Sequence, residues 1–270
     1  MMVLPLPLKN REVLKVDKAN ARDEVYRQLA EVYDPELDQP LTELGFIGDV
    51  RIAGEKVTVR FRLPTYWCAA NFAYMMASDI RERVSELAWV KRVDVMLQDH
   101  FHDEEINEGI KHGKTFQTAF PDATDGLDDL RETFRVKAFQ ARQERVLRWL
   151  IRKGLQEDTI LKMRVGDLEE LLNKRQGAML VERYLSIRQE RGLPGDISAE
   201  AFSHPDGTPI DLGGLELLLK RASSTRLSME FNTAFCSGLL KTRYGEDKQG
   251  LKNADLEKDK TKESTGVIEA

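Results

Sequence analysis

The sequence has no long apolar run and only two cysteines, Cys68 and Cys236, among its 270 residues. A membrane-spanning helix needs about 18 or more consecutive apolar residues, and no window of the chain provides them. Two cysteines are too few for the disulfide framework of a small secreted domain. We therefore expect a soluble, cytoplasmic protein from a reducing compartment, with no membrane as its partner.

Common catalytic and metal-binding motifs are also missing. The chain has no Cys-x-x-Cys pair, no His-Glu-x-x-His motif, no Glu-x-x-His pair for a di-iron bundle, no complete P-loop and no Gly-x-Ser-x-Gly elbow. No paired carboxylates or base–nucleophile spacing takes their place. We expect a protein that is not an enzyme with a substrate of its own.

The charge balance is slightly acidic. Forty-six acidic side chains against 41 basic ones give a formal net charge of -5. A protein that covers nucleic-acid phosphates with one face needs a basic surface, so nucleic acid is not an expected partner.

Composition and periodicity divide the chain into four parts. We expect a mobile N-terminal arm, an α+β domain, an all-α domain and a disordered charged tail, over residues 1–19, 20–120, 121–245 and 246–270. The tail is rich in Lys, Glu and Asp and has almost no large apolar side chains. Burial within it therefore cannot offset the entropy lost on ordering.

The prediction of an α+β domain rests on changes in the spacing of apolar residues along the chain. A helical spacing ends at Asp34-Pro35, because proline disfavours the helical conformation in the residue before it. Two segments with period-two spacing follow, then a helix from about residue 69 to 87, then a third strand. This order predicts helices on one small mixed sheet. The next domain shows helical periods alone, and its last two helices are expected over residues 215–220 and 228–244.

Cys68 is the residue with the clearest chemical interpretation. It lies where a strand gives way to a helix, and the positive end of a helix dipole favours a thiolate, the form that binds metals. The alternative is a small buried residue beside Trp67, since free cysteines are often buried. Cys236 is predicted to be a core residue of the last helix, and we do not pair the two cysteines.

Two further segments carry candidate binding residues. The stretch from Asp99 to Glu105 gathers histidines and carboxylates, which is typical either of a metal site or of a solvated acidic loop. Between residues 131 and 153 the chain has eight Lys or Arg residues and only two acidic ones. This basic helix suits an acidic partner protein, although a solvated helix face is the alternative. Its candidate partner-binding residues are Arg142, Arg145, Arg148 and Trp149.

The first domain resembles the metal-sulfur cluster assembly family that includes SufT, PaaD and the eukaryotic cytosolic iron-sulfur targeting factors. The resemblance covers roughly residues 22–115. It is carried by Asp34-Pro35-Glu36-Leu37, the stretch Leu41 to Ile47, Pro64-Thr65 with Cys68, and the stretch His100 to Asn107.

This resemblance implies both residue roles and a function. Asp34, Pro35, Glu36 and Thr65 fall on family-motif positions, Cys68 on the reactive cysteine, and His100 and Asn107 on positions of the eukaryotic members. It implies a maturation factor that loads iron or an iron-sulfur cluster, bound transiently, onto a client metalloprotein. PaaD is associated with phenylacetate oxidation, so a multicomponent non-haem iron oxygenase is the expected client class.

Two points about ligands and partners stay open. A lone thiolate suits a transient site, or one completed by a client or by a second copy of the chain in a homo-oligomer. His100 is the second candidate ligand. The competing hypothesis is a metal-free adaptor or folding chaperone that binds its client through the helical half.

Overall fold

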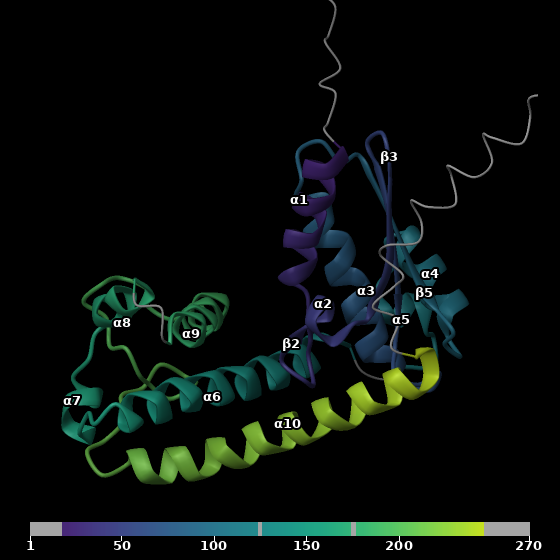
Figure 1. The fold of residues 1–270 in the computed structure, drawn as a ribbon. Helices are drawn as coiled ribbons and strands as arrows, with labels where there is room; N and C mark the ends of the chain where they lie inside the picture. The colour runs from purple at the N-terminus through teal and green to yellow at the C-terminus, as the bar shows by residue number, and fades with distance from the viewer. Residues whose placement is uncertain (1–17, 124–125, 174–176, 246–270) are drawn as a thin grey trace, which may run out of the picture.

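The computed structural model describes residues 18–123, 126–173 and 177–245 (Figure 1). The expected N-terminal arm therefore lies outside the described residues, except for the backbone of its last two positions, and the expected tail lies outside them entirely. The described chain contains the two kinds of structure that the sequence predicts, a mixed α+β domain followed by helices. The fold-class prediction is confirmed.

A three-stranded sheet forms the centre of the N-terminal domain. Its strands are β3 (Ile47–Ala53), β4 (Lys56–Arg62) and β5 (Arg92–Gln98), in the order β3-β4-β5. β3 and β4 form an antiparallel hairpin, whereas β4 and β5 are parallel. A parallel pair needs a crossover, which α3 (Ala70–Ser85) supplies.

Helices cover this sheet and close the core. α1 (Lys18–Ala30) and α3 contribute the fully buried Val25, Leu29, Ile80 and Val84. The short strands β1 (Tyr33–Asp34) and β2 (Gln39–Pro40) pair with each other, and α2 (Leu41–Leu44) follows them. After β5 come α4 (Asp103–Lys111) and α5 (Phe116–Ala119).

The C-terminal part is helical and has a second core. Its helices are α6 (Asp128–Arg152), α7 (Glu157–Leu161), α8 (Val165–Leu172), α9 (Ala178–Glu190) and α10 (Leu215–Tyr244). Phe139, Leu147 and Tyr184 are buried at its centre. No helix in the described ranges is both long and apolar enough to cross a bilayer.

α10 connects the two parts of the molecule. It runs along α6 and continues past the end of that helix to the N-terminal domain (Figure 1). The sequence predicts two helices here, but the chain forms one helix of 30 residues. Its middle has serines and a threonine, which weaken the apolar pattern, but neither glycine nor proline to break the helix. The C-terminal half of α10 consequently reaches the family-motif residues.

Candidate functional site

The Cys68 loop joins β4 to α3. Cys68 immediately precedes Ala69, the N-cap residue of α3, so its thiol lies at the positive end of a helix of 16 residues. Thr65 Oγ1 lies 3.1 Å from Cys68 Sγ, within hydrogen-bonding distance. The Cys68 side chain is half-buried. It is therefore neither a fully buried core residue nor fully exposed to solvent, and a hydroxyl beside it can donate to its thiolate.

His100 supports the backbone of this loop. Its Nε2 lies 2.7 Å from the carbonyl oxygen of Cys68, and its Nδ1 accepts a hydrogen bond from the backbone N–H of His102. A carbonyl can only accept, so Nε2 carries the proton and the ring is neutral. Burial is the main cause that lowers the pKa of His100 below its usual value. Both ring nitrogens are thus occupied, and His100 would have to break one of these bonds to become a metal ligand.

Asn107 has a similar supporting role at the end of β5. Its side-chain oxygen accepts from the N–H of Leu97, and its amide donates to the Leu97 carbonyl, at 2.8 and 3.0 Å. The amide thereby mimics a neighbouring strand and joins α4 to β5. Neither Asn107 nor His100 presents a free polar group to the Cys68 thiol.

The Asp34-Pro35-Glu36 turn leads from β1 toward β2. The Oδ1 atom of Asp34 accepts hydrogen bonds from the backbone N–H groups of Glu36 and Leu37, both at 2.9 Å. Asp34 is buried, and this desolvation raises the pKa of its carboxyl to about 6 despite those bonds. The role of Asp34 at this family-motif position is therefore to hold the turn in shape through its carboxyl group.

Exposed aromatic rings border the Cys68 loop. Tyr66, Trp67 and Phe101 are 44%, 62% and 67% exposed, and the Tyr66 ring makes edge contacts with both others. The backbone N–H of Phe101 donates to the Tyr66 carbonyl, which fixes the two segments together. We call these three residues the aromatic rim. Trp67 therefore does not bury Cys68 as a core neighbour would.

The structure also brings Cys236 against the N-terminal domain, which sequence reasoning missed. Cys236 lies on α10 and packs, like Cys68, against the N-terminal core. Burial is the main cause that raises the pKa of its thiol to about 11, and the negative charges of Asp34, Cys68 and Glu36 add to this effect. The sequence contains no local signal for this contact, because it depends on where α10 lies against the other domain.

The basic helix has a different environment from the exposed face that the sequence predicts. Arg142 is buried and donates to Asp38 and to the Arg183 carbonyl. Arg145 lies 3.6 Å from Asp38, and Arg148 pairs with the fully buried Glu144. Trp149 is partly buried and packs against the second core. All four residues contact other parts of the same chain, and Arg142 in particular is almost fully buried, which leaves it little surface with which to bind a partner.

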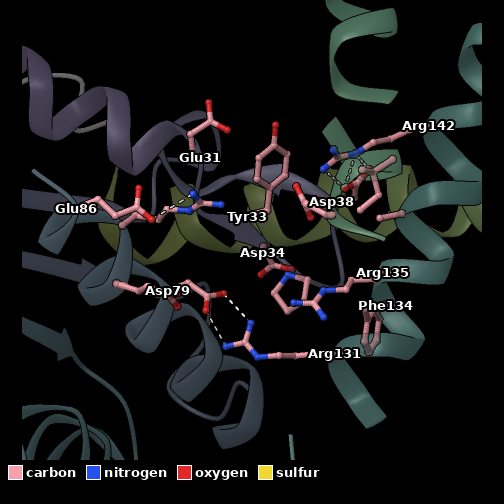
Figure 2. Close-up of a pocket in the computed structure, with 16 residues that line it drawn as sticks. Glu31, Tyr33, Asp34, Asp38, Asp79, Glu86, Arg131, Phe134, Arg135 and Arg142 are labelled. Atoms are coloured by element: carbon pink, nitrogen blue, oxygen red, sulfur yellow. Dashed lines mark hydrogen bonds and ion pairs between the residues drawn. The ribbon is translucent and has the colours of Figure 1, made fainter. Parts of the chain in front are cut away.

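A cavity of about 470 Å³ lies where α6 meets the N-terminal domain (Figure 2). Arg131 forms a bidentate pair with Asp79 on one wall, and Arg142 pairs with Asp38 on another. Asp34 forms part of the lining. Because both acids and arginines line this cavity and several of them pair with each other, it is not a pocket of one charge.

Within the described residues, no three His, Cys, Asp or Glu side chains converge closely enough to hold a metal ion without outside help. The chemistry available around Cys68 is therefore that of an incomplete site. It has a half-buried thiol at a helix N-terminus, a hydroxyl in contact with it, and a second thiol on α10.

Comparison with known proteins identifies the N-terminal domain. A family model described as iron-sulfur cluster assembly protein matches residues 22–95, which include Asp34, Thr65 and Cys68. An uncharacterised protein of Methanocaldococcus jannaschii is 34% identical over 92 residues, which are 33% of this chain and 94% of the archaeal protein. These matches support a role in iron-sulfur cluster assembly. Through its N-terminal domain, the chain belongs to the iron-sulfur cluster assembly protein family.

Proposed function

We propose that this protein is a maturation factor that delivers iron or an iron-sulfur cluster to a client metalloenzyme, with Cys68 as a transient ligand. The observation that carries the proposal is the position of the Cys68 thiol, half-buried at the N-terminus of α3 and 3.1 Å from the Thr65 hydroxyl. The helix dipole and a hydroxyl donor both stabilise a thiolate. A thiolate is the form of cysteine that binds iron.

A small number of ligands suits delivery. Stable iron-sulfur clusters in proteins are held by about four ligands, commonly cysteine thiolates. A carrier with fewer ligands leaves coordination positions that a client, or a second copy of the chain, can fill. Transfer then proceeds by ligand exchange, as client ligands replace Cys68 on the metal.

The aromatic rim is the proposed contact surface for the client. Aromatic side chains are enriched at protein interfaces, where they bury large areas and lose little conformational freedom. Tyr66 and Trp67 precede Cys68 by two residues and one residue, so a client that covers the rim is brought next to the thiol. Partner recognition and metal transfer would then occur at one place.

The client class remains part of the proposal. The resemblance to PaaD favours a multicomponent non-haem iron oxygenase as the client. We propose that the protein acts in the cytoplasm and has no substrate that it converts itself, since its cargo is passed on unchanged.

A transfer assay tests the proposal. The protein is loaded anaerobically with iron and sulfide and mixed with an apo-ferredoxin as a generic acceptor, and cluster formation on the acceptor is followed by absorbance. We expect wild-type protein and the matched control Ser237→Ala to speed cluster formation, and Cys68→Ala to have no such effect. Equal acceleration by Cys68→Ala would contradict a ligand role for Cys68.

One observation favours the second candidate function, a metal-free adaptor. Leu227, Phe231 and Phe235 recur every fourth residue along one face of α10 and are 55%, 73% and 60% exposed. Such an apolar stripe is typical of a protein-binding helix. Under this hypothesis, Phe231→Glu would abolish client maturation in cells while Cys68→Ala would leave it intact.

A further inference from the structure

The C-terminal half of α10 lies against the N-terminal domain, where it contacts the Asp34 turn and the segments before Cys68 and His100. Asn232 donates to the Glu36 carboxylate at 3.4 Å, near the Asp34 turn. Eleven residues further along the helix, Arg243 donates to the carbonyl oxygens of Leu63 and Asp99. Leu63 comes shortly before Cys68 in the chain, and Asp99 immediately precedes His100. α10 therefore crosses the domain from the turn to the Cys68 loop.

Cys236 lies between these two anchoring contacts. It is one turn after Asn232 and one turn before Leu240, whose side chain approaches Gly45. With a rise of 1.5 Å and a rotation of 100° per residue, positions 232, 236, 240 and 243 share one face of a helix. Cys236 accordingly points to the same surface as its neighbours on that face, and both cysteines pack against one apolar core.

We infer that Cys236 and Cys68 together form a two-thiol site for a thiophilic metal ion, with α10 contributing the second ligand from outside the family domain. The inference rests on the proposed function in one respect, since the expected physiological metal is the iron cargo. It adds a residue that lies well beyond the matched segment 22–95.

The chemistry of binding is simple ligand replacement. On each sulfur an S–H bond is replaced by an S–metal bond, the proton passes to solvent, and no electron is transferred. A bound cation favours this exchange at both positions, because it compensates the negative charges of the two thiolates.

Two thiols leave part of the coordination sphere open. Because no third His, Cys, Asp or Glu completes a metal-binding group in the described part of the chain, a client ligand, sulfide or water has to fill the remaining positions. The second thiol would nevertheless hold the metal more tightly than Cys68 alone. It would also tie α10 to the N-terminal domain while the cargo is bound.

Cobalt(II) alone is a suitable probe, because thiolate coordination gives a charge-transfer absorption that reports the number of sulfur ligands. Full-length protein is titrated under anaerobic, reducing conditions as wild type, Cys68→Ala, Cys236→Ala, the double variant and the control Ser237→Ala. We expect the band per bound cobalt to fall by about half in each single variant, with affinity weakened roughly tenfold or more, and to vanish in the double variant. Ser237→Ala should match wild type.

Two results would overturn the inference. A band that is unchanged in Cys236→Ala but lost in Cys68→Ala would exclude Cys236 and leave the proposed function standing. Wild-type protein that gives no thiolate band would exclude a two-thiol site for this cation, while the transfer assay would still decide the role of Cys68.

A metal-free measurement tests the geometry separately. Dibromobimane becomes strongly fluorescent only when it bridges two neighbouring thiols. We expect fluorescence from wild type and Ser237→Ala, and none from either single cysteine variant, each checked for native helix content by circular dichroism. Lack of fluorescence from folded wild type would overturn the proximity on which the inference depends.

Discussion

Arg142 on α6 and Asp38 in the N-terminal domain form a buried bidentate ion pair across 104 positions of sequence. Arg142 Nη2 and Nε lie 2.7 and 3.0 Å from Asp38 Oδ1, and the two side chains are 6% and 3% exposed. Asp38 has a positive φ of 52° in the turn between β1 and β2. Aspartate tolerates that conformation better than most residues. In this turn the Asp38 carboxylate points toward α6, where it meets Arg142.

Replacement of Arg142 tests how strongly this pair holds the two domains together. Arg142→Ala leaves Asp38 as a buried, poorly compensated charge, so we expect a loss of about 3–5 kcal/mol in the free energy of unfolding. The measurement is urea denaturation followed by circular dichroism. Arg135→Ala, an exposed position on the same helix, should change stability by less than about 0.5 kcal/mol. Equal stabilities for the two variants would show that the ion pair contributes little.

Asp34 is expected to make stability depend on pH. Its pKa in the folded protein is about 6, against an ordinary value of 3.8, so the folded state binds the proton more tightly than the unfolded state. The favourable contribution is complete below pH 3.8 and is lost as the pH rises through 6, and two pKa units correspond to roughly 3 kcal/mol.

Asp34→Asn removes this titration and keeps an oxygen that can accept from Glu36 and Leu37. We expect the variant to become more stable relative to wild type as the pH rises from 4 to 7, because only wild type loses the contribution of the protonated carboxyl. Thermal unfolding at several pH values measures that difference. Parallel stability curves for the two proteins would mean that the Asp34 carboxyl titrates normally.

The aromatic rim should matter for transfer and not for folding. Trp67→Ala and Phe101→Ala each remove an exposed ring, so we expect unfolding midpoints close to wild type. Because hot-spot aromatic residues often contribute 2 kcal/mol or more to binding, we expect at least about tenfold weaker client binding, as measured by calorimetry. Leu212→Ala, at an 80% exposed position before α10, is the matched control. Unchanged binding by both rim variants would place the client elsewhere.

Local sequence patterns predicted the N-terminal domain well. The period-two segments became β3 and β4, and the expected helix from residue 69 became α3, which begins at Ala70. The first helix, α1, ends at Ala30 and not at Asp34-Pro35, since Tyr33–Asp34 forms strand β1 and pairs with β2. Cys68 does precede a helix, as the sequence predicts. The correctly predicted features depend on neighbours within a few residues, which is the range over which such patterns carry information.

Contacts between distant segments could not be predicted in this way. Nothing near Arg142 in sequence indicates that Asp38 is its partner, so the basic helix looked like an exposed face. Similarly, Ser223, Ser224 and Thr225 interrupt the apolar pattern of α10, and the position of Cys236 depends on the helix continuing through them. The site around Cys68 was therefore predicted from one domain only, without its α10 component.

Anaerobic reconstitution tests most directly whether Cys68 binds the cargo. Purified wild type, Cys68→Ala and Ser237→Ala are incubated with ferrous iron and sulfide, desalted, and assayed for iron content and visible absorption. We expect bound iron with sulfur-to-iron charge-transfer absorption in wild type and Ser237→Ala, and loss of most of both in Cys68→Ala, with folding unchanged. Equal iron content and absorption in all three proteins would contradict a ligand role for Cys68.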